Sequence, residues 1–180
     1  YYGEDLIISY EKIEDVKAWE EAIQRVAVGT SYLNYTLDTD HQQIIIPTVG
    51  NSMAYGENKI IIQADGYKTA QISVNLQKRN ESELEVSKDE EGNIYITGLS
   101  KDFAKSIRAL SIDGKGLFND TQVSAGKGDY ELKGEVITLR AKCFVNSDGT
   151  QQTLKIVAEG YNDVYVQFTP DRVENGNGGQ

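Results

Sequence analysis

The sequence IIIQADGYKTAQISV at residues 60–74 returns in altered form as LKIVAEGYNDVYVQF at residues 154–168. In each copy an alternating strand runs into an acidic-Gly-Tyr turn, and a second alternating strand follows. Glycine supplies the positive φ that such a turn commonly needs, and alternation puts one face of each strand into a core. We therefore predict a tandem repeat in which each copy ends in this hairpin. The structural motif residues at the two turns are Gly66, Tyr67, Gly160 and Tyr161.

A chain of 180 residues is long enough for two small domains. The polar run KRNESE at residues 78–83 is the expected linker. We predict a first repeat over residues 1–79, a second over 80–170, and a disordered Gly/Asn-rich tail over 171–180. The abrupt start at Tyr1-Tyr2-Gly3, without a signal peptide, and the glycine-rich end indicate a fragment of a larger chain. We expect this fragment to be a monomer.

The net charge of -10 is spread evenly, because residues 1–78 hold 6 basic and 11 acidic residues and residues 79–180 hold 12 and 17. Each half therefore carries -5. Nucleic acids and anionic membrane surfaces require a basic footprint, so we expect neither as a partner. No apolar run approaches the length of about 18 residues that a transmembrane helix needs, so no membrane insertion is expected.

The two copies begin alike. Residues 5–10 form a first strand, and residues 14–24 place Trp19 at helical spacing. In the second copy Ser100 caps a short helix whose Phe103 faces the core, in the same site as Trp19. Short helices among many alternating strands predict a mostly β chain of two tandem small β-sandwich (Ig-like) domains, each with a short helix near its start.

Two further expectations concern loops and strands. The Asp113-Gly114 pair predicts a hairpin turn, and the first copy, which lacks the acidic residue before Gly29, is expected to have a shorter hairpin there. Alternation from Ile137 to Val145 predicts one long strand over residues 135–145, with Cys143 buried in it. A single cysteine excludes an intrachain disulfide and metal sites built on several cysteines.

The residues predict no catalytic chemistry. The one histidine, His41, lies in a polar loop without a nucleophile motif, and we expect it to be exposed. Asp38, Asp40 and His41 form only a weak pattern for a cation. We therefore expect no enzyme, no metal site and no cofactor.

Tyrosine is over-represented, with eleven Tyr against four Phe and one Trp. Its apolar ring and polar hydroxyl suit binding surfaces. Tyr32, Tyr35 and Tyr55 lie in predicted loops of the first copy, so they are the candidate ligand-binding residues. The alternative is that they are turn and rim residues of a polar β protein. Tyr67 and Tyr161 are expected to pack at their hairpin ends.

The repeat unit resembles the haemoglobin-interacting domain family of the streptococcal haemoprotein receptor, formerly a domain of unknown function. The family pattern is an aromatic-bearing helix, a V-x-V-(N/D)-G turn and a strand ending A-(D/E)-G-Y. Here the pattern is carried by Trp19, Val26–Gly29 and Ala64–Tyr67, and again by Phe103, Leu110–Gly114 and Ala158–Tyr161. The two copies cover about residues 5 to 170.

The resemblance implies a non-catalytic extracellular binding module, secreted or on the surface of a Gram-positive bacterium, that contacts a host or cell-surface protein, with a haemoprotein as one candidate. His41, Met53 and the tyrosines are haem-ligand candidates by residue type only. Two alternatives stay open. The tandem could be a structural spacer or stalk repeat of a larger surface protein, or a glycan-binding module whose loop tyrosines stack on sugars.

Overall fold

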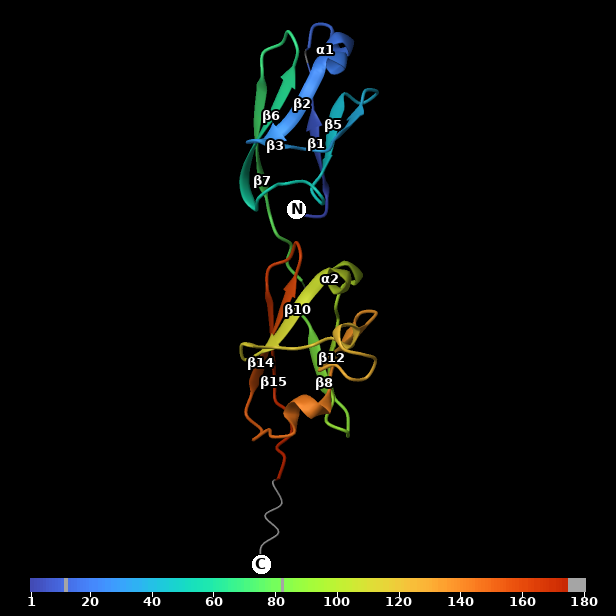
Figure 1. Ribbon diagram of the computed structural model, residues 1–180, viewed down its shortest axis with the longest axis vertical. Helices are drawn as coiled ribbons and strands as arrows, with labels where there is room; N and C mark the ends of the chain where they lie inside the picture. Colours follow the sequence, from blue (N-terminus) through green and yellow to red (C-terminus); the bar gives the residue numbers. More distant parts are fainter. Residues whose placement is uncertain (12, 82, 175–180) are drawn as a thin grey trace, which may run out of the picture. The chain divides into compact units, whose positions relative to one another are not determined.

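The computed structural model describes residues 1–11, 13–81 and 83–174. The chain divides into two compact units, Tyr1–Arg79 and Asn80–Gln180 (Figure 1). Every paired strand runs antiparallel to its neighbour, apart from one isolated parallel bridge between Asn119 and Tyr130. Each unit is described separately below.

The first unit holds two sheets and one helix. Its three-stranded sheet has the order β1-β5-β4, with bounds Asp5–Ser9, Gln43–Pro47 and Thr36–Asp38. Its four-stranded sheet has the order β3-β2-β6-β7, with bounds Ser31–Tyr32, Ile23–Val28, Gly56–Ala64 and Ala70–Leu76. Helix α1, Val16–Ala22, connects β1 to β2 and lies at one end of the two sheets (Figure 1).

The second unit repeats this plan with one more strand. The first sheet has the order β12-β13-β9-β8, with bounds Tyr130–Lys133, Val136–Leu139, Ile94–Thr97 and Glu85–Lys88. The other has the order β11-β10-β14-β15, with bounds Lys115–Gly116, Ile107–Ile112, Gln152–Ala158 and Val164–Phe168. Helix α2 is Lys101–Ser106, and two 3₁₀ turns cover Asp120–Gln122 and Ala141–Phe144.

Each core lies between its two sheets, because every second residue of a strand points inward. In the first unit Ile44, Ile46 and Ile60 have no exposed surface. The fully buried strand residues of the second unit are Ile94, Ile96, Ile137, Leu139, Leu154 and Ile156. The prediction of a mostly β chain with two tandem β-sandwich domains is confirmed.

One aromatic residue of each helix is buried, four positions before the isoleucine that follows the helix as its C-cap. Trp19 is 7% exposed and lies with its ring centre 4.9 Å from that of Tyr10. Phe103 is fully buried and meets Tyr161 edge-on at 5.0 Å. Asp15 and Ser100 cap the two helices by accepting a hydrogen bond from a backbone N–H of the first turn.

The repeated acidic-Gly-Tyr turn is tied to the end of each helix. The N–H of Asp65 donates to the carbonyl of Ala22 at 2.8 Å, and the N–H of Glu159 donates to Ser106 at the same distance. Ala22 and Ser106 are the last residues of their helices, so each bond satisfies a carbonyl that has no partner within the helix. The following glycines, Gly66 and Gly160, have φ of 79° and 82°.

The two turn tyrosines differ in their packing. Tyr161 is 7% exposed and packs on Phe103, whereas Tyr67 is 41% exposed. The expectation that Tyr67 packs at its hairpin end is therefore wrong. In the first unit Tyr10, at the end of β1, already occupies the position beside the helix aromatic.

The early hairpins have equal length, so the expectation of a shorter first hairpin is wrong. Two residues link β2 to β3 and two link β10 to β11. Asp113 and Gly114 both have positive φ, which is the pattern of a type I′ turn. In the first copy only Gly29 does, at the position where a type II′ turn needs glycine.

The predicted long strand over residues 135–145 is also wrong. Strand β13 ends at Leu139, and the backbone then turns, with the N–H of Cys143 donating to the carbonyl of Arg140 at 3.0 Å. Cys143 is half-buried on this 3₁₀ turn, and Val145 is 56% exposed. The turn instead buries Phe144, which the alternation had placed on the outer face.

The first residues of the predicted tail contact the second unit. Lys88, the last residue of β8, forms an ion pair with Asp171 and donates to the carbonyl of Thr169. The N–H of Val173 donates to the carbonyl of Ser147 at 2.9 Å. The rest of the predicted disordered tail, residues 175–180, lies outside the described residues.

A buried hydrogen bond links the first strand to the first helix. The hydroxyl of Tyr10 donates to Oε1 of Glu20 at 2.5 Å, and Glu20 is 9% exposed. Burial, and next the bond to Glu20, raise the pKa of Tyr10 well above its ordinary value of 10.0.

Replacing the turn glycines tests whether their positive φ requires glycine. Gly66→Ala and Gly160→Ala should each destabilise their unit by about 1–2 kcal/mol, because alanine is strained at these φ values. This corresponds to a loss of several degrees in Tm, measured by calorimetry. Gly116→Ala is the matched control for the second unit, since its φ lies outside the left-handed region and an added Cβ meets nothing within 4 Å. An equal loss in the control would contradict the argument.

Tyr10→Phe should cost the first unit about 1–3 kcal/mol, because Glu20 stays buried without its donor. The free energy of unfolding of the variant should also fall less steeply than that of the wild type as the pH rises above about 10. The unfolded tyrosine loses its proton first, so the wild-type stabilisation is complete below about pH 10 and is lost as pH rises through the folded pKa. Trp19, the one tryptophan, reports this unit in urea titrations at about pH 9 and pH 11. If the free energy of unfolding changed with pH equally in both proteins, the raised pKa of Tyr10 would be refuted.

Candidate functional site

Tyr32 lies on the solvent face of the four-stranded sheet of the first unit. It pairs with Ala27 on β2, one residue along from the inward-facing Val26. Tyr32 is 70% exposed, and its ring lies under the guanidinium of Arg25, with Cζ 5.1 Å from the ring centre. A cation at this distance from a tyrosine ring is attracted to its π face and holds the ring in place.

The residues beside Tyr32 on the same face of the sheet combine polar side chains with Ala27 and Ile61. Ala27 is fully buried although it points to the solvent face, so its neighbours cover it. In register across the sheet, Ala27 lies opposite Ile61, and Ile61 opposite Gln71. We call this surface the tyrosine face; its residues are Arg25, Ala27, Tyr32, Ile61, Gln63 and Gln71.

The second unit carries a related surface built from other strands. Tyr165 on β15 points to the solvent face of its sheet and is 62% exposed. Lys155 lies 6.0 Å from the centre of this ring and 3.3 Å from Asp163. At the position of Tyr32 the second copy has Gly116, on edge strand β11. The exposed aromatic side chain of the second copy, Tyr165, lies instead on β15, at the opposite edge of the sheet.

Tyr55 belongs to a separate cluster. Its ring centre is 5.7 Å from that of Tyr2, and Nζ of Lys78 is 4.8 Å from the Tyr55 ring. Tyr55 is 45% exposed. Tyr35 is different again, since it is half-buried and packs against the first core. The three tyrosines predicted to bind a ligand thus have three different environments.

Sequence reasoning missed the partners of these rings. Arg25 could have been found, because alternation along residues 23–28 puts it on the solvent face beside Ala27. Tyr2 and Lys78 carry no such signal, since their approach to Tyr55 depends on how β1 and β7 lie in the fold.

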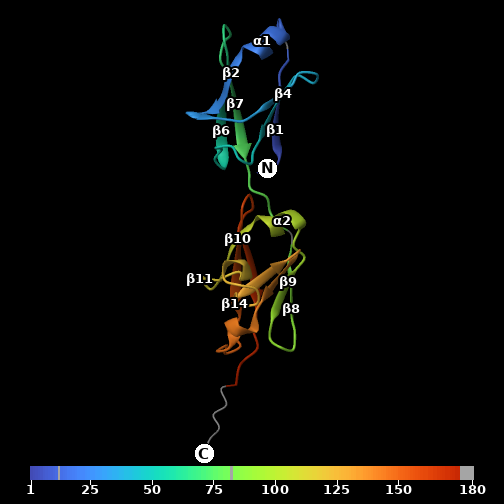
Figure 2. The same ribbon diagram turned by 45° about the vertical axis from the view of Figure 1, so that its right-hand side comes forward.

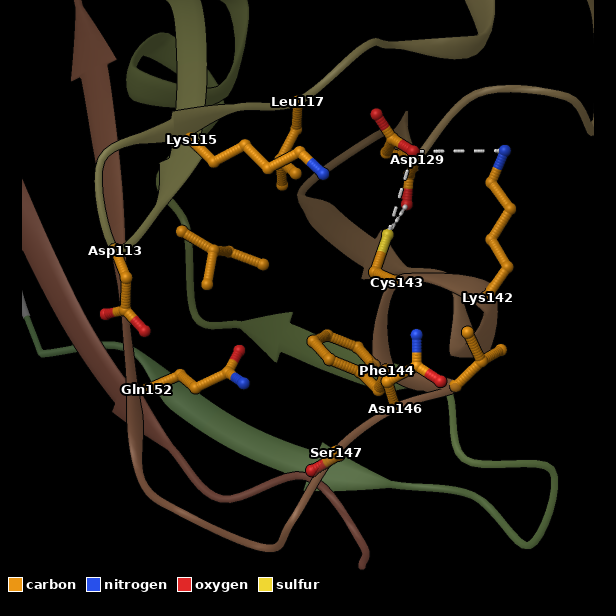
Figure 3. Close-up of a pocket in the computed structure, with 12 residues that line it drawn as sticks. Asp113, Lys115, Leu117, Asp129, Lys142, Cys143, Phe144, Asn146, Ser147 and Gln152 are labelled. Atoms are coloured by element: carbon orange, nitrogen blue, oxygen red, sulfur yellow. Dashed lines mark hydrogen bonds and ion pairs between the residues drawn. The ribbon is translucent and has the colours of Figure 1, made fainter. Parts of the chain in front are cut away.

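A pocket of about 520 Å³ opens in the second unit (Figure 3). Its floor is apolar, from Ile112, Leu117 and Phe144, and its rim is charged. Among the rim residues, Asp129 is already engaged: its Oδ2 accepts from the N–H of Phe118 at 2.9 Å, and its Oδ1 lies 3.9 Å from Nζ of Lys142. The thiol of Cys143 points toward Asp129 (Figure 3).

The thiol in this pocket is not a reactive nucleophile. Burial, and next the charge of Asp129, raise the pKa of Cys143 to about 11. At neutral pH the group is therefore a protonated thiol, which is a poor nucleophile and metal ligand.

His41 pairs with Asp38, with 2.7 Å between Nδ1 and Oδ2, and its side chain is 71% exposed. That hydrogen bond lowers the pKa of Asp38. Within residues 1–11, 13–81 and 83–174, no three His, Cys, Asp or Glu side chains gather where they could hold a metal ion. In the same ranges no helix is long and apolar enough to cross a membrane.

Comparison with known families matches both units. The model of the Hb-interacting domain of Shr-like heme-binding proteins matches residues 1–77 and again residues 80–170. The chain belongs to this family. Each Hb-interacting domain therefore coincides with one repeat, and the resemblance inferred from the aromatic helix and the A-(D/E)-G-Y strand is confirmed. No curated protein sequence matches the chain.

Solved structures give only distant likenesses. A trimodular endoglucanase of the GH5_4 subfamily is 12% identical at a TM-score of 0.39, over 95% of this chain and 33% of that one. Tp47, a lipoprotein of Treponema pallidum, is 12% identical at a TM-score of 0.34, over 86% of this chain and 42% of that one. The Bacteroides ovatus protein SGBP-B is 14% identical at a TM-score of 0.29, over 95% of this chain and 40% of that one. The chain thus spans less than half the length of each of these proteins.

The state of the thiol can be tested directly. The rate of Cys143 alkylation by iodoacetamide should be low at about pH 8 and reach half its maximum near pH 11, because only the thiolate reacts. Asp129→Asn should move this midpoint to lower pH by removing the negative charge beside the sulfur. A wild-type midpoint near pH 8.5, the value of a free cysteine, would contradict the burial argument.

Proposed function

We propose that this tandem is a non-catalytic, extracellular binding module and that its first domain contacts a haemoprotein through the tyrosine face. Membership of a family of Hb-interacting domains supports the class of partner. The observation that carries the location is Tyr32, the most exposed large aromatic or aliphatic side chain among the described residues, whose ring is covered on one side by the guanidinium of Arg25.

The chemistry of the tyrosine face suits a protein partner. Tyrosine and arginine are enriched among the residues that dominate binding energy at protein interfaces. The cation–π contact restrains the Tyr32 ring before binding, which reduces the entropy lost when a partner covers it. Gln63 and Gln71 extend the same face with amide groups that donate and accept hydrogen bonds.

The other tyrosines are weaker anchors. Tyr35 is half-buried in the first core, so its removal would change packing as well as binding. Part of the ring surface of Tyr55 is already in contact with Tyr2 and Lys78. We therefore place the main contact at Tyr32, and the Tyr55 cluster is a second contact that a large partner could reach.

Surface plasmon resonance against haemoglobin tests the proposal. The wild-type chain should bind, and Tyr32→Ala should weaken the affinity by at least about tenfold through loss of a central aromatic anchor. Tyr67→Ala is the matched control, since Tyr67 is an exposed tyrosine on the hairpin end of the same unit, and it should change Kd by less than about twofold. Trp19 fluorescence verifies that both variants are folded.

Absence of wild-type binding at about 100 μM would remove the haemoglobin version of the proposal. Equal losses in the two tyrosine variants would show that the tyrosine face is not the contact. The spacer role and the glycan-binding role would then be the remaining interpretations of the tandem, because neither predicts a haemoprotein contact at Tyr32.

A further inference from the structure

The second unit has two connecting segments that are longer than their counterparts in the first. Residues 117–129 link β11 to β12, where residues 33–35 link β3 to β4. Residues 140–151 link β13 to β14, where residues 48–55 link β5 to β6. Figure 2 shows the first long segment after β11 and the second, in orange, before β14. Binding residues often lie on long connections that a rigid sheet scaffold holds in place.

Both long segments line the pocket of about 520 Å³ (Figure 3). Leu117 and Asp129 come from the first segment, and five lining residues between Lys142 and Ser147 or at those positions come from the second. The hairpin of β10 and β11 and the start of β14 complete the lining. The pocket is thus built within one unit, away from both ends of the chain. Its volume lies in the range that small organic ligands occupy in proteins.

The two segments hold each other in place. The carboxylate of Asp120 accepts hydrogen bonds from the N–H groups of Gly126 and Gly128, at 2.9 and 2.8 Å. Asp120 also forms an ion pair with Arg140, at the start of the second segment. The N–H of Arg140 donates to the carbonyl of Asp129 at 2.9 Å. Because these walls are already ordered, a ligand that enters the pocket loses less affinity to ordering them.

One cation of the pocket has no partner. The carboxylate of Asp129 lies 3.9 Å from Nζ of Lys142. That of Asp113 accepts from the N–H of Thr153 at 3.1 Å. In the described part of the chain, by contrast, no group forms a hydrogen bond or an ion pair with the ammonium of Lys115. The pocket therefore has a positive charge available for an acceptor that enters it.

The charge of Lys115 reaches the interior of the pocket. Its side chain extends along the rim beside Leu117 (Figure 3). Burial, and next the charge of Asp129, raise the pKa of Cys143, and the charge of Lys115 acts in the opposite direction. The amide of Gln152 also lines the pocket and can donate hydrogen bonds. An anionic group in the pocket would thus meet both a cation and an amide donor.

We propose that this pocket binds small organic carboxylates that have an apolar body. The carboxylate pairs with the ammonium of Lys115 and accepts a hydrogen bond from the amide of Gln152. The apolar body covers the floor formed by Ile112, Leu117 and Phe144. The site belongs to the second unit, so it does not depend on the haemoprotein contact proposed for the first.

Three ligands with the same apolar body and different charge test the proposal: 4-phenylbutyrate, 4-phenylbutan-1-ol and 4-phenylbutylamine. We expect 4-phenylbutyrate to shift the NMR amide signals of Leu117, Cys143 and Gln152, with a Kd below about 1 mM. The alcohol should bind about threefold more weakly, because it lacks the ion pair. The amine should bind about tenfold more weakly, because Lys115 repels it.

Substitution of Lys115 separates the ion pair from the apolar contact. Lys115→Met should weaken 4-phenylbutyrate to the affinity of the alcohol and leave the alcohol unchanged. Lys115→Glu should reverse the order, so that the amine binds more tightly than the carboxylate. Lys133→Met is the matched control, since Lys133 is an exposed lysine on β12 outside the pocket lining, and it should leave all three affinities unchanged.

Cys143 provides a second measurement inside the pocket. Saturating 4-phenylbutyrate should slow alkylation of Cys143 by iodoacetamide at about pH 9 by at least about twofold, because the bound ligand covers the thiol. The same concentration of 4-phenylbutylamine should slow it less.

Absence of shifts at these amides with 4-phenylbutyrate at about 5 mM would overturn the proposal. Equal affinities of the wild type for the carboxylate and the amine would do the same, as would unchanged 4-phenylbutyrate binding in Lys115→Met. Haemoglobin binding of Lys115→Met should equal that of the wild type, so this result and the result for Tyr32 can fail independently.

Discussion

Each domain depends on one backbone hydrogen bond, from the acidic residue of the late hairpin turn to the last carbonyl of the helix. The bond is 2.8 Å long in both units. It satisfies a helix-end carbonyl that would otherwise need another partner, and it fixes the hairpin against the helix. Once that turn is fixed, the next residue must take a positive φ, and the helix aromatic, Trp19 or Phe103, is held between the sheets. The recurring motif is thus a joint between hairpin and helix.

Much of this could be predicted from the sequence, because alternation and turn chemistry act locally. The repeat, the buried aromatic residues and the cap at Ser100 follow from patterns within a few residues. The errors have a different origin. Cys143 continues the apolar alternation of the sequence but lies on a 3₁₀ turn. In the first unit Tyr10, which is distant from Tyr67 in sequence, packs beside the helix aromatic in the position that Tyr161 has in the second unit. The pairing of Tyr2 with Tyr55 also depends on contacts between distant segments.

The two copies share their interior and differ on their surfaces. Tyr32 of the first copy corresponds to Gly116 of the second, and Tyr165 of the second corresponds to Gln71 of the first. The inward residues at the paired positions of the two central strands of this sheet, β2 and β6 in the first copy and β10 and β14 in the second, stay aliphatic in both. A duplicated β-sandwich can therefore vary one face at little cost in stability, since exposed substitutions usually change the free energy of unfolding little.

The contact of Lys88 with Asp171 and Thr169 has a mechanical consequence. It places the end of β8 beside the chain just past β15, so the start of β8 and the end of β15 lie at opposite ends of the second unit. Tension along the chain would then pull these strands lengthwise against β9 and β14. Under such shear the hydrogen bonds of each ladder bear the load together, whereas a strand peeled from one end would lose them singly. The terminal strands of the second unit therefore lie in a shear geometry with respect to such a pull.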